Sequence, residues 1–567
     1  MAGGVWMMKK RACAASLRWG FACVLLVCVL AALGSGLAAE NQDDFCLCYG
    51  GEQLYISKRS DHYYLFVPGS WAGDAITVGT ENGVLIDGVA YQHQDAAPPL
   101  EDGARWSIRM GGDEAVTRKV IIRVGSPLPA LFLHTESGSL AFVHKDKENR
   151  EPGQYCLFTP EQEPLTGGLE YMRMRGNTTL KQPKKPYMIK LDQKQSLLGM
   201  NRAKKWVLLA DHLDVSLLRN RITLDLVRAA GVRYAVDCRH VDLYINGEYR
   251  GLYLLCEKIE ISDQSVAITD QQDAYEVLNP GEVTDHSMQL FSKKNGDEVG
   301  GFSVYRAYTG MNNPADITGG YLLECDKKHR FYEDKYVGFI TGNGTTVEVK
   351  EPECASVEMV TYIGEQMNAF HRAILTNDGV DPVTGAAWDE LMDAESLAHK
   401  YLIEEFTLNF DAMDGSQYFY KDVDAVSTKI YAGPAWDYDL TFGNVRHNPL
   451  RMYLRSMEDG HREFWYPHLH RFDSFEQLLG QLWRDTYSPL IRSLLEPTEG
   501  SPLRPITAYA EEISASAAMN TLRWGKGTVK GRDSAIGNSF SSGVDYLLYY
   551  VETRLKYIDK HFALGED

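Results

Sequence analysis

Three aspartates stand in unusually apolar surroundings between residues 409 and 444. Asp411 lies in NFDAMDGSQYFYKD, where an apolar helical pattern ends, and Asp437 and Asp439 lie among aromatic residues in GPAWDYDLTFGN. A carboxylate in apolar surroundings is costly unless it is paired or bound to a cation. These acids are therefore candidates for metal binding or acid–base chemistry. The alternative is that Asp411 caps a helix and Asp437 pairs with an arginine.

The elements predicted around these acids follow a definite order. A helix at about 394–408 leads to Asp411, the segment Tyr418–Tyr420 has the pattern of a strand, and a polar turn precedes Asp437. A kinase-type phosphotransferase presents its catalytic-loop acid and then its metal-binding acid in this order.

A predicted hairpin at Leu169–Asp192 carries groups that can hold phosphate. Its tip, RGNTT, begins at Arg175 and offers amides, hydroxyls and a guanidinium. Such groups cradle phosphate oxygens. Lys190 lies in the returning strand, where a nucleotide-binding lysine would be useful. The alternative is a basic hairpin that faces solvent.

The elements further along the chain indicate a β-rich half followed by an α-rich half. Leu217–Ala230 is an amphipathic helix, and two strands at His240–Ile245 and Leu252–Cys256 are joined by the turn signal Asn246-Gly247. Beyond residue 444 the pattern is helical. This order predicts an α+β fold, a two-lobed enzyme with a cleft between the lobes.

Composition excludes some classes of protein. The 567 residues carry a formal net charge of −19 and no accompanying basic block, which argues against nucleic-acid binding. Seven cysteines follow residue 39, and an odd number spread so thinly does not form a disulfide scaffold.

The predicted domains are an N-terminal signal peptide, a β region and a catalytic region. Residues 1–39 combine basic residues, an apolar run and small residues, as in a secretory signal peptide, and an uncleaved membrane anchor is the alternative. Residues 40–126 resemble a small all-β, sandwich-like domain. Residues 127–567 form the third region, with a polar, irregular insertion at about 262–318.

Seven motifs in order resemble the CotH kinase family of secreted, spore-coat atypical protein kinases of bacteria. They are RGNTT with PKKPYMIKL, KKWVLLADHLDVSLLRN, GEYRGLYLLCEKIE, GGYLLECD, VEVKEPE, NFDAMDGSQYFYKD and GPAWDYDLTFGN, and the resemblance extends from about Leu128 to the carboxyl end, about three quarters of the chain. The resemblance implies a two-lobed protein-kinase-like fold, ATP, and Mg²⁺ or Mn²⁺. It also implies transfer of the γ-phosphate to Ser of a Ser-rich protein, in the medium or at the cell surface or envelope.

The resemblance also implies a role for each site residue. Asp411 is similar to the catalytic-loop acid, and Asp437 to the metal ligand, with Asp439 close by. Ser416 stands where many relatives have a metal-binding Asn, which weakens the expected second metal site. The implied nucleotide-binding residues are Arg175, Gly176, Asn177, Thr178, Lys190 and Glu257.

Two other functions stay open at this stage. The same fold could serve a non-catalytic surface or envelope protein that only binds a partner. It could also serve another ATP-dependent transfer, such as nucleotidylation or small-molecule phosphorylation. Contact with a membrane is expected only through an uncleaved signal peptide.

The first testable prediction concerns the amino terminus. The mature protein should begin near Ala39 or Glu40 and be found outside the cytoplasm, because the small residues before this point form a cleavage site. Amino-terminal sequencing of the natural protein checks this. Recovery of soluble cytosolic protein that retains Met1 would contradict it.

Overall fold

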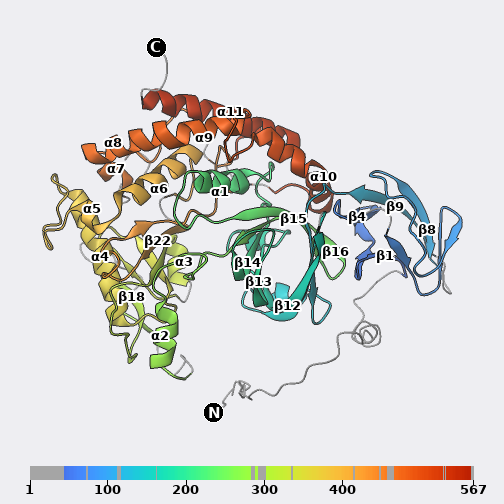
Figure 1. Ribbon diagram of the computed structural model, residues 1–567, viewed down its shortest axis with the longest axis horizontal. Helices are drawn as coiled ribbons and strands as arrows, with labels where there is room; N and C mark the ends of the chain where they lie inside the picture. The colour runs from blue at the N-terminus through green and yellow to red at the C-terminus, as the bar shows by residue number, and fades with distance from the viewer. Residues whose placement is uncertain are drawn as a thin grey trace. The chain divides into compact units, whose positions relative to one another are not determined.

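The structure is a computed structural model that describes most of the chain from Asp44 to Phe562 (Figure 1). The described residues are 44–562 except 72–74, 111–115, 161, 282–287, 292–301, 334–335, 413–414, 446–447, 456–464, 528 and 530–531. The predicted signal peptide and Asp414 lie outside the described residues.

Short strands with alternating burial build the amino-terminal region. One sheet has the order β2(Glu52–Tyr55), β1(Cys46–Tyr49), β5(Thr77–Gly79). The other has the order β3(Ser57–Arg59), β4(His62–Val67), β9(Thr117–Val124), β8(Arg105–Met110), β6(Val84–Ile86), β7(Val89–Tyr91). In β8, Trp106, Ile108 and Met110 are buried and alternate with more exposed residues, which is the period-2 pattern of a strand with one covered face. The predicted β-rich amino-terminal region is confirmed.

A closed seven-stranded barrel follows. Its order is β10(Ala130–Thr135), β11(Glu151–Thr159), β12(Gln162–Met174), β13(Tyr187–Ser196), β14(Arg202–Leu209), β16(Glu248–Glu257), β15(Cys238–Ile245), and the parallel pair β10–β15 closes it. Strands β12 and β13 form the predicted hairpin, with residues 175–186 as its connection. Tyr187, Ile189 and Leu191 belong to the apolar cluster that fills the barrel, so the alternate residues Met188 and Lys190 lie on its outer face.

A second seven-stranded sheet lies beyond the barrel in the chain. Its order is β17(Met288–Leu290), β18(Ser303–Tyr308), β20(Gly338–Ile340), β21(Thr346–Glu351), β19(Tyr321–Cys325), β22(Gln417–Lys421), β23(Tyr431–Ala432). The prediction of an irregular insertion at 262–318 was wrong in part, because its described residues include α2(Gln271–Leu278), β17 and β18. These two strands are short and weakly apolar, yet the sheet uses them as its edge.

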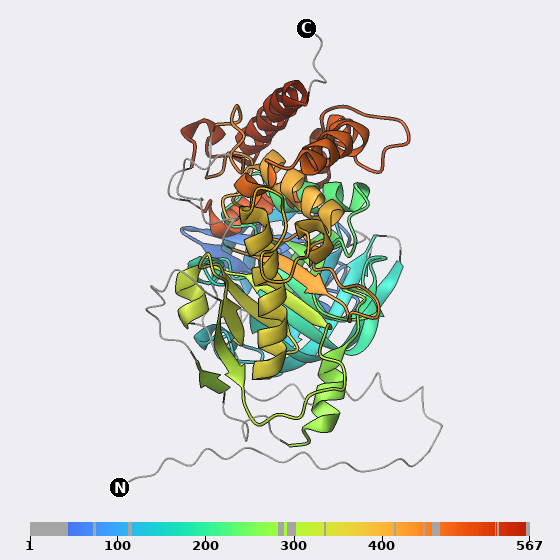
Figure 2. The same ribbon diagram turned by 90° about the vertical axis from the view of Figure 1, so that its left-hand side faces the viewer.

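Helices make up most of the carboxyl-terminal part. They are α1(Arg219–Ala229), α3(Lys328–Glu333), α4(Val357–Leu375), α5(Trp388–Leu391), α6(Ala394–Thr407), α7(Tyr466–Leu469), α8(Asp473–Leu482), α9(Ser488–Leu495), α10(Ile506–Trp524) and α11(Phe540–His561). Figure 2 shows α4 running alongside the second sheet, where it contacts β18 and β20. Helix α11 is tied to α6 by a fully buried ion pair between Arg554 and Glu405. Since α6 leads to Asp411, this pair fixes the helix that delivers the acid.

The amino-terminal region and the barrel share one apolar core. Phe132 of β10 and Tyr244 of β15 stack with ring centroids 4.6 Å apart, and both belong to a buried cluster with the strands of the first two sheets. Ser516 of α10 adds polar contacts, because its hydroxyl donates to Asp242 (2.7 Å) and accepts from the Ser126 amide (2.9 Å). Residues 43–567 form one compact unit.

Two further expectations can be compared with the described residues. All seven described cysteines are free thiols, and Cys238, Cys256 and Cys325 are buried core residues as expected. Among the described helices, none combines the length and the apolar character needed to cross a bilayer.

Candidate active site

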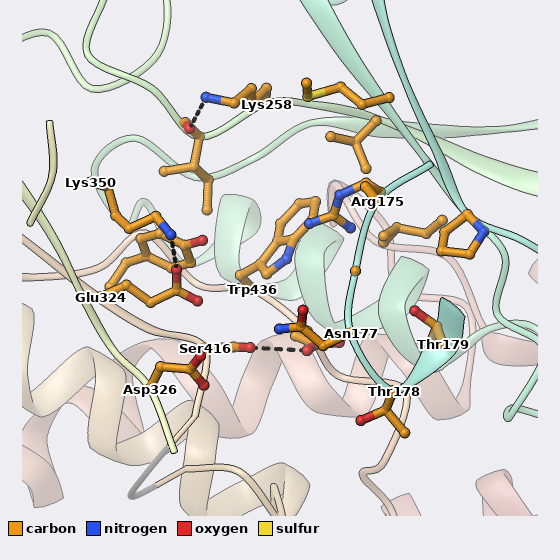
Figure 3. Close-up of a pocket in the computed structure, with 18 of the residues that line it drawn as sticks. Arg175, Asn177, Thr178, Thr179, Lys258, Glu324, Asp326, Lys350, Ser416 and Trp436 are labelled. Carbon is orange, nitrogen blue, oxygen red and sulfur yellow. Dashed lines mark hydrogen bonds and ion pairs between the residues drawn. The ribbon is translucent and has the colours of Figure 1, made fainter. Parts of the chain in front are cut away.

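One cavity of about 320 Å³ collects most of the predicted site residues (Figure 3). Its walls come from the outer face of the barrel, the loop that follows β12, strands β19 and β21, and the two aspartate-bearing segments. The predicted residues that line it are Arg175, Gly176, Asn177, Thr178, Asp411, Ser416, Asp437 and Asp439. Segments more than 250 residues apart in the sequence therefore meet here.

Asp411 is positioned by the end of α6. The helix stops at Leu408, which adopts the left-handed conformation (φ 50°). The Asn409 side-chain oxygen then accepts a hydrogen bond from the Asp411 amide (3.0 Å). The Asp411 carboxylate forms an ion pair with Lys327, so it does not cap a helix. The pair leaves Asp411 at the cavity wall with a cation beside it.

Asp437 and Asp439 line the same cavity. Asp437 has a positive φ of 72°, a conformation that side chains with a Cβ seldom adopt. The chain therefore bends at Asp437, and both acids face the cavity. The Ser416 hydroxyl donates to Asp437 Oδ2 (3.0 Å), a contact drawn as a dashed line in Figure 3.

The carboxylates repel one another at this site. Burial, and then the charge of Asp411, raises the pKa of Asp437. Burial raises the pKa of Asp439 well above its ordinary value, and the charges of Asp437 and Asp211 raise it further. Among the described residues, none donates a hydrogen bond or presents a cation to the Asp439 carboxylate, which is 8% exposed. Among the described residues, the Asp439 carboxyl therefore has no partner that would stabilise its charged form.

Asp211 is a fourth acid that sequence reasoning missed. It lies just after β14, lines the cavity, and has a pKa raised to about 7, mainly by burial. The Asn220 side chain in α1 donates to Asp211 (2.7 Å) and accepts from the Tyr438 amide (2.7 Å). Asn220 thus joins Asp211 to the segment between Asp437 and Asp439. The available signal was an acid directly after the apolar run WVLLA.

Buried Glu404 connects the two aspartate-bearing segments from behind. It is 0% exposed and accepts hydrogen bonds from the Asn409 side chain (2.7 Å) and the Tyr438 hydroxyl (3.1 Å). Lys400, one turn earlier in α6, lies 3.7 Å from the same carboxylate. The Asn409 side chain also accepts a hydrogen bond from the Asp411 amide. Through Asn409 and Tyr438, Glu404 therefore fixes both the backbone next to Asp411 and the residue between Asp437 and Asp439.

The loop after β12 forms the opposite wall. The Arg175 guanidinium lies over the Trp436 ring, 5.4 Å from its centroid (Figure 3). Gly176 has φ 86°, and a Cβ there would come within 2.6 Å of the Thr179 hydroxyl. This turn therefore requires glycine. Asn177 and Thr178 follow it along the cavity wall.

A further group of acids lines the cavity from the second sheet, and no role was predicted for it. Lys350 lies between Glu324 (3.1 Å) and Glu348 (3.0 Å), and Arg330 lies 3.3 Å from Asp326. One oxygen of Glu348 is buried without a hydrogen-bond partner. Burial raises the pKa of Glu348 to about 7. These residues come from the motifs GGYLLECD and VEVKEPE, which marked a resemblance but carried no assignment.

The donor set of the cavity fits a hard divalent cation. The lining has ten acidic side chains (Glu148, Asp211, Glu324, Asp326, Glu348, Glu351, Glu353, Asp411, Asp437, Asp439) and six basic ones (Lys147, Arg173, Arg175, Lys258, Arg330, Lys350), so acidic groups outnumber basic groups by four. Carboxylate and hydroxyl oxygens are the ligands that Mg²⁺ prefers, often one or two carboxylates beside waters and phosphate oxygens. Among the described residues, no three acidic, His or Cys side chains are grouped closely enough to hold a metal alone. Among the described residues, further ligands could be neutral groups of the lining such as the Ser416 hydroxyl, together with waters or phosphate oxygens.

The structure does not bring Lys190 and Glu257 to this cavity. Lys190 lies on the barrel's outer face and pairs with Glu170 (2.5 Å). The Glu257 carboxylate accepts from the backbone amides of Asn201 (2.8 Å) and Asp237 (3.1 Å). Both residues line a second cavity. Met188, two positions before Lys190 on the same face of β13, is the residue of that strand nearer the site, because it lines the first cavity.

A pH-dependent stability should follow from the raised pKa of Asp211. In the folded protein this carboxyl titrates near 7, and in the unfolded chain near 4. Its contribution to the free energy of unfolding is therefore fully present below about pH 4 and is lost as the pH rises through about 7. An Asn side chain does not ionise, so Asp211→Asn removes this loss. The melting temperature of the variant minus that of the natural protein should therefore increase from about pH 4 to about pH 7 and then stay constant.

Buried histidines change the stability with pH in the opposite direction. The test is therefore the difference in melting temperature between each variant and the natural protein, measured at the same pH. Burial lowers the pKa of His212 to about 4 and of His240 to about 3. Thermal denaturation of the natural protein, Asp211→Asn and the exposed control Asp545→Asn gives these differences. A difference for Asp211→Asn that is flat with pH would contradict the prediction.

The comparisons with known proteins agree with this geometry. The family model described as CotH kinase protein matches residues 172–558, which include all the predicted site residues. No curated protein matches the chain. Because the family match covers more than half of the sequence, the family assignment holds for the chain as a whole. The chain belongs to the CotH kinase family.

Proposed function

We propose that the protein is a secreted atypical protein kinase that transfers the γ-phosphate of ATP to Ser of a protein substrate with the help of a divalent cation. Family membership already indicates a phosphotransferase. The observation that carries the finer proposal is that one cavity joins Asp411, the Asp437–Asp439 segment and the Arg175–Thr178 loop. This is the set of groups that phosphoryl transfer needs: an acid at the acceptor, acids at the metal and a loop at the phosphates.

The charge of the cavity supports a metal-dependent reaction with a nucleotide. A lining with four more acids than cations repels a polyphosphate, unless divalent cations bind together with it. Asp437 and Asp439 would hold Mg²⁺ or Mn²⁺, with the Ser416 hydroxyl beside Asp437. When bound there, a divalent cation would neutralise negative charge on the phosphates. The cation would also supply a counter-charge to Asp439, which is buried and has no partner among the described residues.

Other residues of the cavity would position the acceptor hydroxyl and the phosphates. Asp411 would orient the acceptor hydroxyl and accept its proton late in the transfer, and Lys327 keeps the carboxylate oriented. Arg175 and the amides of the Gly176 turn would hold phosphate oxygens. In this reading the cleft separates two lobes, the barrel on one side and the second sheet with its helices on the other.

The partners and the location complete the proposal. The acceptor would be a Ser-rich protein at the cell surface, in the envelope or in the medium, reached after removal of residues 1–39. The cavity is partly open to solvent, which supports a macromolecular acceptor. Nucleotidylation is the outcome that the experiment below separates from phosphorylation.

The proposed chemistry predicts different losses for two acids. Asp411→Asn should keep affinity for metal–ATP within a few fold, while transfer falls at least about a hundredfold, because the proton acceptor is lost. Asp437→Ala should abolish metal-dependent ATP binding, because a proposed ligand of the divalent cation is removed. Calorimetry with ATP and Mg²⁺ measures binding, and labelled-phosphate transfer to Ser-rich proteins measures chemistry.

The matched control is the exposed Asp545 of α11, because Asp545→Asn makes the same change away from the cavity. It should leave both readouts unchanged. Intact-mass analysis of the acceptor separates an added phosphate from an added nucleotide. Full transfer by Asp411→Asn, or unchanged metal–ATP affinity in Asp437→Ala, would overturn these assignments.

A second prediction concerns Glu404 as a positioning residue. Glu404→Gln can still accept from Asn409 but leaves Lys400 without its buried counter-charge, and Tyr438→Phe removes only the link to Tyr438. Both should lower metal–ATP affinity, since Tyr438 separates Asp437 from Asp439. A purely structural role would lower the melting temperature without changing affinity in the folded fraction. If the two changes act through one network, their effects on affinity in a double-mutant cycle are not additive.

A further inference from the structure

Two thiols of the amino-terminal β region lie next to each other. Cys46 and Cys48 both belong to β1, and their sulfur atoms are 3.6 Å apart. Cys46 is buried, whereas Cys48 is partly exposed, so the pair can be reached from solvent. The proposed kinase reaction uses neither residue, because both precede the barrel and the active-site cavity in the chain.

The two thiols lie on the face of β1 that is turned away from the apolar core. Side chains alternate along a strand, and Leu47, between the two cysteines, belongs to the apolar cluster of this region. Neither cysteine belongs to that cluster. The strand partners of Cys48 are Gln53 and Thr77, both polar. A buried free cysteine usually serves as a small apolar core residue, and packing into the core does not account for this pair.

Gly79 of β5 leaves the space in which the two sulfur atoms converge. It is the strand partner of Cys46. A Cβ at this position would overlap the Cys46 sulfur and come within 2.9 Å of the Cys48 sulfur. Any larger residue would therefore push the two sulfur atoms out of their present positions.

The strand geometry favours a bridging ion over a disulfide bond. Residues two positions apart in a strand have Cα atoms roughly 6.6 Å apart, whereas a disulfide usually joins Cα atoms about 5.5–6 Å apart. Strand β1 is paired on both sides, with β2 and β5, which keeps it extended. Two thiolates at about 2.3 Å from a tetrahedral ion are about 3.8 Å from each other, close to the separation observed here.

We propose that Cys46 and Cys48 together bind one thiophilic cation, Cu(I), as a pair of thiolate ligands. Thiolates are the soft ligands that select Cu(I). Among the described residues, no third His, Cys, Asp or Glu side chain is close enough to enlarge the ligand set. Structural Zn²⁺ almost always takes four protein ligands, whereas Cu(I) forms stable complexes with two thiolates. Binding would release the thiol protons to solvent and leave the oxidation state of the copper unchanged.

The test is a competition for Cu(I) without oxygen, with ascorbate as the reductant. The purified full chain is titrated against bathocuproine disulfonate, a Cu(I) chelator whose absorbance falls when the protein takes the ion. The natural protein should remove one Cu(I) per chain. Cys46→Ser and Cys48→Ser should each lower the affinity at least about a hundredfold, because one thiolate alone does not hold the ion.

Gly79→Ala tests the geometry without removing a thiol. The added methyl group separates the two sulfur atoms, so the affinity for Cu(I) should fall at least about tenfold. The matched control is Cys354→Ser, because Cys354 is also a partly exposed free thiol but lies in the segment between β21 and α4. It should leave the affinity within about twofold. Melting temperatures of all four variants identify any variant that has lost its fold.

Four results would overturn the proposal. They are an unchanged Cu(I) affinity in either folded single variant of the β1 pair, an equal loss in Cys354→Ser, tighter binding of Zn²⁺ than of Cu(I) by the natural protein, and recovery of the natural protein with a disulfide between Cys46 and Cys48. Peptide mass mapping detects the disulfide. The kinase assignment does not enter any of these measurements, so its failure would leave the copper site unaffected.

Discussion

Repulsion among buried carboxylates is the constraint on which the architecture of this site depends. Asp211, Asp411, Asp437 and Asp439 share one cavity, and only Asp411 has a cation paired with its carboxylate among the described residues. Holding like charges together in a poorly hydrated place costs free energy, which the fold must offset elsewhere. The positive φ of Asp437 adds strain at the same point. Such a site is stable in a single geometry only if the surrounding structure fixes it.

That support comes from behind the cavity, through Glu404. A carboxylate has two oxygens that accept hydrogen bonds, so it can hold Asn409 and Tyr438 at once, which an apolar side chain of the same size cannot do. Its burial is costly, and Lys400 offsets part of that cost. From the other side, Asn220 holds Asp211 to the Tyr438 backbone. The three acid-bearing segments are therefore joined by neutral or paired groups outside the repulsive centre.

Periodicity and turn signals were enough to predict much of the fold. The hairpin of β12 and β13, helix α1 and helix α6 lie close to their predicted bounds, because their apolar periodicity and end signals are clear in the sequence. Strands β17 and β18 were missed because β17 has only three residues and neither strand shows a clear alternation of apolar and polar residues, so their pairing in the sheet and the packing of α4 on β18 are not visible in the sequence.

The site itself was predictable only in part. Asp411 and Asp437 stand out locally, since acids are rare in apolar sequence. Asp211 and Glu348 reach the cavity through the packing of distant segments, which spacing does not reveal. Lys190 shows the limit clearly: alternation predicts that it lies on the barrel's outer face, but not how far along that face the cavity extends. The bend at Asp437 is likewise set by contacts with α1 rather than by its own sequence.

The closure of the barrel has a consequence for where this protein can be divided. The family match begins at residue 172, near the end of β12, so β10, β11 and most of β12 precede it. Without them, β13 and β15 would become open edges with unpaired amides and carbonyls, and the barrel's apolar interior would face water. A truncated chain that starts at the family boundary would thus expose the wall behind the Arg175 loop. The part of the chain that relatives share is smaller than the part that has to fold.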